Sequence, residues 1–74
     1  MRWDVNQAEA YVLRLGHSLE VLADAPGLGL RIDKIRHGYL KFPAGSHVIF
    51  YRQSESGIEV IRILHKSMDV ERHL

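Results

Sequence analysis

Hydrophobic positions in the first third of the chain recur at spacings of three and four, which is the pattern of an amphipathic helix. Asp4 precedes the pattern and Gln7 follows three positions later, as in a capping box. Pro26 ends the pattern. The sequence therefore predicts a helix from about Val5 to Asp24 with one apolar stripe. The stripe consists of Ala8, Tyr11, Val12, Leu15, Leu19, Leu22 and Ala23.

Short β-branched and aromatic segments bounded by turn residues follow from residue 39, which is the pattern of strands. Pro43, Ala44 and Gly45 predict a turn, and a polar connection at 54–57 predicts a hairpin. Residues 30–38 have weak periodicity and crowded charges, so we expect a connecting segment with room for one helical turn. The predicted strands are Tyr39 to Phe42, His47 to Gln53 and Ile58 to Leu64.

Both faces of the predicted hairpin carry apolar side chains, because successive residues of a strand point to opposite faces. The helix can cover only one face, so we expect the other to remain an apolar patch that a protein partner covers. The predicted fold class is α+β, with one long amphipathic helix packed on a three-stranded antiparallel sheet, and residues 1–74 as a single domain. On the strand His47 to Gln53, one face is predicted to carry Val48, Phe50 and Arg52 and the other His47, Ile49 and Tyr51. On the strand Ile58 to Leu64, one face is predicted to carry Ile58, Val60, Arg62 and Leu64 and the other Glu59, Ile61 and Ile63.

The 74 residues can bury only a small core, which supplies roughly 3 to 5 kcal/mol in chains of this size. The chain has no cysteine, so disulfides and thiolate metal sites are excluded and a reducing, cytoplasmic location is expected. No apolar run approaches the roughly 18 residues that span a bilayer, so no membrane association is expected. Nor does the amino end read as a secretory signal.

The charge is distributed unevenly but weakly. Residues 1–30 hold two basic and four acidic residues, for a net charge of −2, and residues 31–74 hold eight and five, for a net charge of +3. Nucleic-acid binders usually carry a denser basic stripe. We therefore interpret the charge as solvation and as steering of a protein partner.

Candidate catalytic and metal-binding residues are sparse. The histidines are scattered without close ligand spacing, so no metal site is predicted. His65, Asp69 and His73 could suggest acid–base chemistry, but a polar tail explains them more simply. GxSxG, P-loop, GxGxxG and HExxH motifs do not occur, so we expect no cofactor and no catalytic residue. The histidines are His17, His37, His47, His65 and His73.

Three stretches of the carboxyl-terminal half carry a specific resemblance. They read GSHVIFYR at 45–52, GIEVIRILH at 57–65 and MDVERHL at 68–74. These three segments closely resemble the sequences of the ParE toxins, which belong to the ParE/RelE superfamily of bacterial toxin–antitoxin modules. Upstream, residues 3–22 resemble the second family helix and residues 26–42 the connection into the sheet. The resemblance therefore covers nearly the whole chain.

The sequence departs from the family at two places. Family members normally begin with a strand and a first helix, which precede the helix that residues 3–22 resemble. Here Met1 comes directly before that second helix, so the sequence lacks this pair of elements. We expect the shortened form to leave an edge and an apolar face less covered. The ribonuclease branch of the superfamily has two arginines and a tyrosine where this chain has His47, Ser67 and His73. The resemblance therefore favours a toxin that acts by binding.

The resemblance implies a toxin that binds and inhibits DNA gyrase and is neutralised by a cognate antitoxin, which is extended and partly disordered when free. We expect a toxin–antitoxin hetero-oligomer and no enzymatic activity. Expected antitoxin-binding residues are Tyr11, Leu15, Ile49, Tyr51, Ile61 and Ile63. Expected target-binding residues are Arg62, Lys66 and Arg72.

Two alternatives remain open at this point. The chain could be a ribosome-dependent mRNA endoribonuclease that uses Lys41, Arg52, Arg62 and Lys66, or a non-toxic remnant that still binds antitoxin. Arg52 and Arg62 fall on one face of the predicted hairpin. Pairing with carboxylates, or packing past apolar neighbours, is the simpler role for both.

Overall fold

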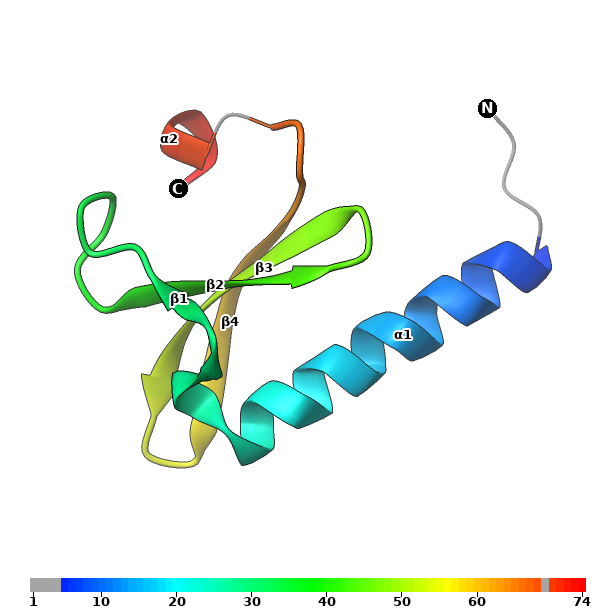
Figure 1. The fold of residues 1–74 in the computed structure, drawn as a ribbon, viewed down its shortest axis with the longest axis horizontal. Coiled ribbons are helices and arrows are strands. Elements are labelled where there is room, and N and C mark those ends of the chain that lie inside the picture. The colour runs from blue at the N-terminus through cyan, green and yellow to red at the C-terminus, as the bar shows by residue number, and fades with distance from the viewer. Residues whose placement is uncertain (1–4, 69) are drawn as a thin grey trace.

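The computed structural model describes the backbone of residues 5–68 and 70–74, and the side chains of this part apart from those of residues 5–9 and 71. An antiparallel meander of four strands, in the order β1-β2-β3-β4, lies against one long helix (Figure 1). The α+β class is confirmed, and so is the range of the long helix. The predicted capping residue Asp4 lies outside the described residues. The elements are α1 (Val5–Asp24), the 3-10 turn η1 (Pro26–Leu28), β1 (Leu30–Arg31), β2 (Tyr39–Ala44), β3 (His47–Ser54), β4 (Gly57–His65) and α2 (Val70–His73).

The sheet has one strand more than predicted. Leu30 and Arg31 form β1 and pair with Lys41 and Leu40 of β2. Two residues are too few to show alternation in the sequence, which is why this segment looked like a connection. Strand β2 also continues through Pro43, where the sequence predicted its end. The pairing with β1 includes only Leu40 and Lys41 of β2, so Pro43 lies on an edge of the sheet, where proline is tolerated.

Helix α1 packs on one face of the sheet, as its stripe predicts. Leu22 has no exposed surface and lies in a core cluster with residues of β2 and β3. Leu15 and Leu19, one and two turns before it, pack on the same cluster because residues three and four apart share a helix face. The cluster consists of Leu22, Leu40, Ala44, Ile49 and Tyr51, with Leu15, Leu19, Phe42 and Ile58 packed around it.

A buried tyrosine attaches the turn after α1 to the sheet. The hydroxyl of Tyr51 accepts a hydrogen bond from the Gly29 N–H and donates one to the Pro26 carbonyl, both at 2.8 Å. Tyr51 has no exposed surface, so its polar group would be costly if it were unpaired. These two bonds satisfy it and fix η1 above β3.

The second face of the sheet is covered, so the prediction of an open apolar face there was wrong. Phe50, Ile32 and Leu64 are buried in a second core cluster. Its cover comes from Ile35 of the 32–38 connection and from Val70 and Leu74 of the tail, and Tyr39 of β2 and Val48 of β3 pack against the same cluster. A guanidinium nitrogen of Arg36 donates to the Leu74 oxygen at 2.9 Å and holds the tail in place. Short apolar pairs in charged surroundings give too weak a pattern to reveal this cover.

A β-bulge shifts the register between β3 and β4. Phe50 lies opposite Arg62, but Tyr51 lies opposite Val60, so Ile61 is the extra residue. Directly opposed residues share a face, so Val60 lies on the α1 face and Arg62 on the other. The strict alternation predicted for this strand was therefore wrong from Ile61 onward.

The turn before β2 gives a prediction about acid stability. The carboxylate of Asp33 accepts hydrogen bonds from the Gly38 N–H and the Arg31 guanidinium, both at 2.9 Å, and these lower the pKa of Asp33. A lowered pKa stabilises the fold above the ordinary aspartate value, and this stabilisation is lost as the pH falls. Urea midpoints at about pH 6 and about pH 2 should therefore differ less in Asp33→Asn than in the wild type. An equal or larger difference in the variant would contradict this assignment.

Candidate protein-interaction surface

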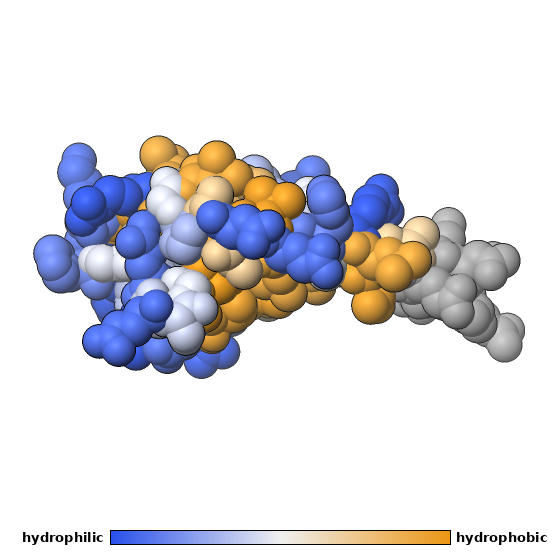
Figure 2. Space-filling view, turned by 90° about the horizontal axis from the view of Figure 1, so that it is seen from below, coloured by the Kyte–Doolittle hydropathy of each residue, from blue (hydrophilic) through white to orange (hydrophobic). Residues whose placement is uncertain are grey.

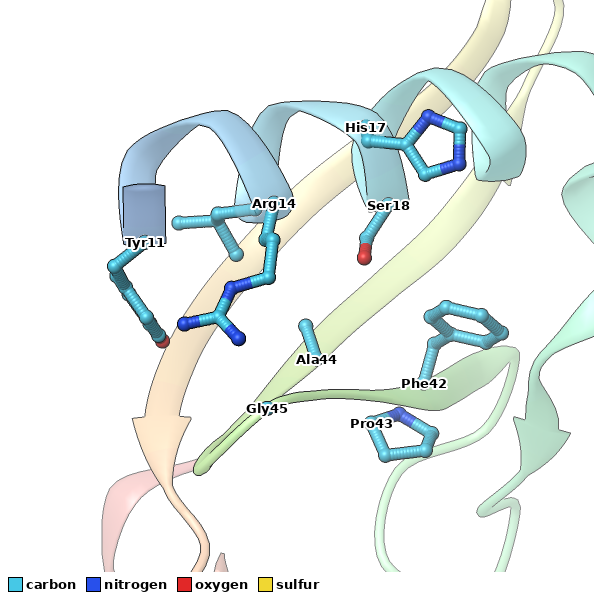
Figure 3. A pocket seen from close by; sticks show the side chains of 9 residues that line it. Tyr11, Arg14, His17, Ser18, Phe42, Pro43, Ala44 and Gly45 are labelled. Atoms are coloured by element: carbon cyan, nitrogen blue, oxygen red, sulfur yellow. The ribbon is translucent and has the colours of Figure 1, made fainter. Parts of the chain in front are cut away.

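Helix α1 and the end of β2 enclose a groove of about 360 Å³, shown in Figure 3. The groove has apolar lining residues, since Leu15 and Phe42 both line it and pack against the core cluster beneath α1. Arg14 reaches from α1 toward the end of β2, and Ser18 points into the groove (Figure 3). The groove is lined by Tyr11, Arg14, Leu15, His17, Ser18, Phe42, Pro43, Ala44 and Gly45.

A second hollow, of about 470 Å³, lies on the other side of the same strand. It shares Phe42 and Pro43 with the groove, so the two hollows flank one stretch of strand edge. Leu28 and Leu30 at this hollow are 53% and 65% exposed. Apolar surface therefore continues from α1 around the edge of β2.

A positively charged side chain lines each of these two hollows. Arg14 stands at the groove, which His17 also lines, and Lys41 stands at the second hollow. Within the described part of the chain, neither hollow is lined by an aspartate or a glutamate. An apolar floor with a basic rim suits a ligand that carries both apolar groups and carboxylates.

A further apolar area lies at the start of α1 and along β4, the other edge strand. Val12 and Leu13 are 65% and 73% exposed, and the first turns of α1 extend beyond the sheet (Figures 1 and 2). On β4, Val60 and Ile63 are 40% and 37% exposed. Figure 2 shows hydrophobic surface along the helix side of the molecule, interrupted by hydrophilic side chains.

The residues expected to bind antitoxin divide into two groups. Tyr11 and Leu15 line the groove, and Ile63 lies exposed on β4 near the half-buried Ile61. Ile49 and Tyr51, by contrast, have no exposed surface and form the core beneath α1. Those two residues therefore offer nothing to a partner in this fold. Their alternation placed them correctly on one face, but it could not show that α1 covers that face so completely.

The residues expected to bind the target are exposed, and Arg62 lies away from the groove. Arg62 is exposed on the face opposite α1, beside Phe50. Lys66 and Arg72 are exposed on the tail, whose short helix packs on that same face through Val70. The thickness of the sheet therefore separates Arg62 from the apolar groove, whereas the Lys66 N–H donates to the Ser46 carbonyl, next to the groove residue Gly45.

Arg52, which the ribonuclease alternative would use, is engaged in a salt bridge. Its guanidinium donates to both carboxylate oxygens of Glu59 at 2.9–3.1 Å, across the β3–β4 pair. Both side chains are about half exposed, so the pair contributes little to stability. The simpler role expected for this arginine, pairing with a carboxylate, is confirmed.

The structure brings together histidines that the sequence left scattered. His47 and His65 are direct partners on β3 and β4, with ring centroids 5.4 Å apart. The hydroxyl of Tyr11 bonds to Nδ1 of His47, and Nδ1 of His65 lies 2.7 Å from Ser67 Oγ. The pairing depends on hairpin register, which spacing along the chain does not show. His73 is exposed on α2, and in the described residues no three potential metal ligands of the His, Cys, Asp or Glu type cluster.

Two polar residues of the groove were not predicted, because they fall outside the apolar stripe of α1. Arg14 and Ser18 flank Leu15 in the groove, although nothing in their spacing marks them. Among the described helices, none has the length and apolar character needed to cross a membrane.

Comparison with known proteins identifies the family. The family model for the ParE toxin of the type II toxin-antitoxin system parDE matches residues 1–70. A protein named Toxin ParE1 from Mycobacterium tuberculosis H37Rv is 49% identical over 74 residues, covering 99% of this chain and 76% of that protein. Toxin ParE1 from Caulobacter vibrioides is 42% identical over 73 residues, covering 99% and 75%. The chain therefore belongs to the ParE toxin family and is the toxin of a type II toxin–antitoxin system.

Proposed function

We propose that this toxin inhibits DNA gyrase by binding to it, without catalysis, and that a cognate antitoxin neutralises the toxin. The observation that carries the proposal is the match to the ParE family over residues 1–70. The two relatives align with 99% of this chain, so the match includes both the helix and the sheet.

The surface of the molecule supports an antitoxin partner. Large hydrophobic side chains stand exposed on α1, at Val12 and Leu13, and at Leu28 of η1 and Leu30 of β1. Contiguous apolar surface on a small domain typically marks a protein interface. A small core also gains from ligation, since a partner that binds only the folded state adds stability by mass action. We expect a hetero-oligomer in which an extended, partly disordered antitoxin orders on the toxin.

Two observations favour binding over ribonuclease chemistry. His47, at a position where the ribonuclease branch has an arginine, is half-buried and hydrogen-bonded to Tyr11 beneath α1. Arg52 is paired with Glu59. Both groups are occupied by contacts within the fold. Binding needs a complementary surface and no acid or base, and the exposed Arg62, Lys66 and Arg72 would contact the target with salt-sensitive strength.

The deciding experiment compares two assays at equal protein concentration, using toxin freed of antitoxin. We expect inhibition of gyrase supercoiling that saturates near equimolar toxin, and no cleavage of ribosome-bound mRNA. Addition of antitoxin should restore supercoiling. Arg62→Glu should inhibit more weakly, while Glu55→Gln, in the β3–β4 turn, serves as the control and should inhibit as the wild type does.

Three outcomes would contradict the proposal. Multiple-turnover cleavage of mRNA would identify a ribonuclease. Inhibition of supercoiling that the antitoxin cannot reverse would show that the antitoxin does not neutralise the toxin. Silence in both assays, with antitoxin still bound, would indicate a non-toxic antitoxin-binding protein.

A further inference from the structure

We propose that the cross-strand pair His47–His65 is a proton-sensitive latch for the tail, residues 66–74. When the pair is neutral, His65 holds the turn that leads from β4 into the tail, and protonation of His65 releases that turn. The latch consists of residues of this chain alone, so it does not depend on the proposed target or on an antitoxin.

The pair lies where α1, the β2–β3 turn and the tail meet. His47 and His65 are direct partners on β3 and β4, and their ring centroids are 5.4 Å apart. The hydroxyl of Tyr11, on α1, bonds to Nδ1 of His47. The Lys66 N–H donates to the Ser46 carbonyl at 3.0 Å, which places the start of the tail beside the β2–β3 turn. A change of charge at the pair therefore acts on all three elements.

The hydrogen bonds of His65 require that its Nδ1 carries no proton. The Ser67 backbone N–H donates to this nitrogen at 3.2 Å, and Ser67 Oγ lies 2.7 Å from it. A backbone N–H can only donate, so Nδ1 accepts and the proton of the neutral ring is on Nε2. Protonation would place an N–H on Nδ1, facing the Ser67 N–H. The bond to the backbone would then be lost.

His47 responds to a proton in a different way. Its Nδ1 bonds to the Tyr11 hydroxyl, which can donate to a neutral ring or accept from a protonated one. That contact therefore survives protonation, which makes His65 the sensing residue. His47 adds repulsion once both rings are charged, because like charges directly opposite each other on two strands are destabilising.

The described surroundings of the pair offer positive charge and no counter-charge. Arg14 and His17 of α1 line the groove that also contains Tyr11, and Lys66 follows His65 directly and is exposed. The β2–β3 turn, at residues 45 and 46, contributes no titratable side chain. Among the described side chains, no aspartate or glutamate joins the two rings in a group of three. A charged pair would therefore lack a carboxylate to stabilise it.

The position of the tail depends on this turn. Helix α2 has four residues and is too short to be stable by itself. The tail is held by the packing of Val70 and Leu74 on the second core cluster and by the bond from Arg36 to the Leu74 oxygen. Loss of the Ser67 bond removes part of this attachment. We therefore expect a more mobile tail on an otherwise folded protein.

The test follows the mobility of the tail with a nitroxide label. The chain has no cysteine, so a label on His73→Cys reports on α2 alone and also removes the histidine there. Electron paramagnetic resonance spectra at about pH 7.5 and about pH 5.5 cover the range in which histidine takes up its proton. The ratio of mobile to immobilised label should rise about fivefold at the lower pH, as expected for the loss of one hydrogen bond. Asp33 stays ionised in this range, because its hydrogen bonds lower its pKa.

Three further variants, each made with His73→Cys, assign the response. His65→Asn places a carboxamide oxygen near the position of Nδ1, so the label should be immobilised at both pH values. His65→Ala has no acceptor, so the label should be mobile at both. His37→Gln removes an exposed histidine of the 32–38 connection, which covers the same core as the tail, and should keep the full response.

Circular dichroism at both pH values reports whether the sheet and α1 stay folded, as the latch requires. Nitrogen NMR of the wild type at about pH 7.5 should show Nδ1 of His65 without a proton. The latch is overturned by a proton on that nitrogen, by a label that does not respond to pH, or by unfolding of the whole chain at the lower pH. A response that persists in His65→Asn, or that disappears in His37→Gln, would also overturn it.

Discussion

Replacing Leu22 with alanine is expected to remove most of the stability of this protein. Leu22 has no exposed surface and is the helix residue at the centre of the α1-side core, against Leu40, Ile49 and Tyr51. Truncating a buried leucine typically costs about 2 to 5 kcal/mol, because transfer energy is lost and a cavity remains. A core of this size supplies only about 3 to 5 kcal/mol in total. Leu22→Ala should therefore be largely unfolded at physiological temperature.

The measurement is a circular-dichroism melt of the isolated toxin beside the matched variant Val12→Ala. Val12 belongs to the same predicted stripe but is 65% exposed, so its truncation should leave the melt nearly unchanged. A cooperative transition of Leu22→Ala close to that of the wild type would show that α1 does not pack as described. Antitoxin should recover part of the lost structure, since binding shifts the equilibrium toward the folded state.

The contrast between Leu22 and Val12 shows what the pattern of the helix could and could not predict. Spacings of three and four identify both residues as stripe positions. The stripe runs further along the helix than the sheet does, and the first turns of α1 extend beyond the sheet (Figure 1). Periodicity thus predicted the helix and its face, but the exposed end depends on how far the sheet reaches.

The sheet was less accessible to sequence analysis for a similar reason. The β3–β4 hairpin and the faces of β3 follow from alternation, and Ile49 and Phe50 indeed lie in opposite cores. Alternation fails at Ile61, because a bulge adds one residue and changes the face of everything after it. Nothing in a run of β-branched residues marks the position of that extra residue.

The candidate groove shows how tertiary contacts limit the prediction of sites. Tyr11 and Leu15 were expected at an interface and do line the groove. Arg14, between them, lies outside the apolar stripe, although the end of β2 brings Ala44 and Gly45 to the same groove (Figure 3). The distinction between the buried Tyr51 and the accessible Tyr11 likewise required the packing of α1 on β3.

Among the glycines with a negative φ, Gly29 is expected to be the one whose replacement lowers the stability of the fold most. A Cβ built on Gly29 would lie 2.5 Å from the Tyr51 hydroxyl oxygen and 2.8 Å from the Lys41 carbonyl oxygen. The backbone of Gly29, with φ of −69° and ψ of 166°, suits any residue, so the conflict is steric. Gly29→Ala must therefore move the turn away from β3 and break its bonds to Tyr51. We expect a loss of about 2 kcal/mol, seen as a lower urea midpoint.

The same substitution elsewhere provides the control with the opposite sign. In the described part of the chain, apart from the adjacent backbone of α1, no atom lies within 4 Å of a Cβ built on Gly16, which is inside α1. Gly16→Ala should raise the urea midpoint, because alanine favours helix over glycine by about 1 kcal/mol. A higher urea midpoint in both variants would show that backbone entropy, rather than the close approach of Gly29 to Tyr51, governs the effect.

A double-mutant cycle with Tyr51→Phe isolates that close approach. Tyr51→Phe alone should destabilise the fold, because it removes both bonds of the buried hydroxyl and leaves the Gly29 N–H and Pro26 carbonyl without this partner. In the double variant the oxygen 2.5 Å from the new methyl group is gone. The loss in the double variant should therefore be smaller than the sum of the two single losses, with the Lys41 carbonyl oxygen and the ring Cε1 of residue 51, each 2.8 Å from the new methyl group, as the remaining conflicts. Strict additivity would mean that Gly29 and Tyr51 act independently, and the attachment of the turn to β3 would then have another origin.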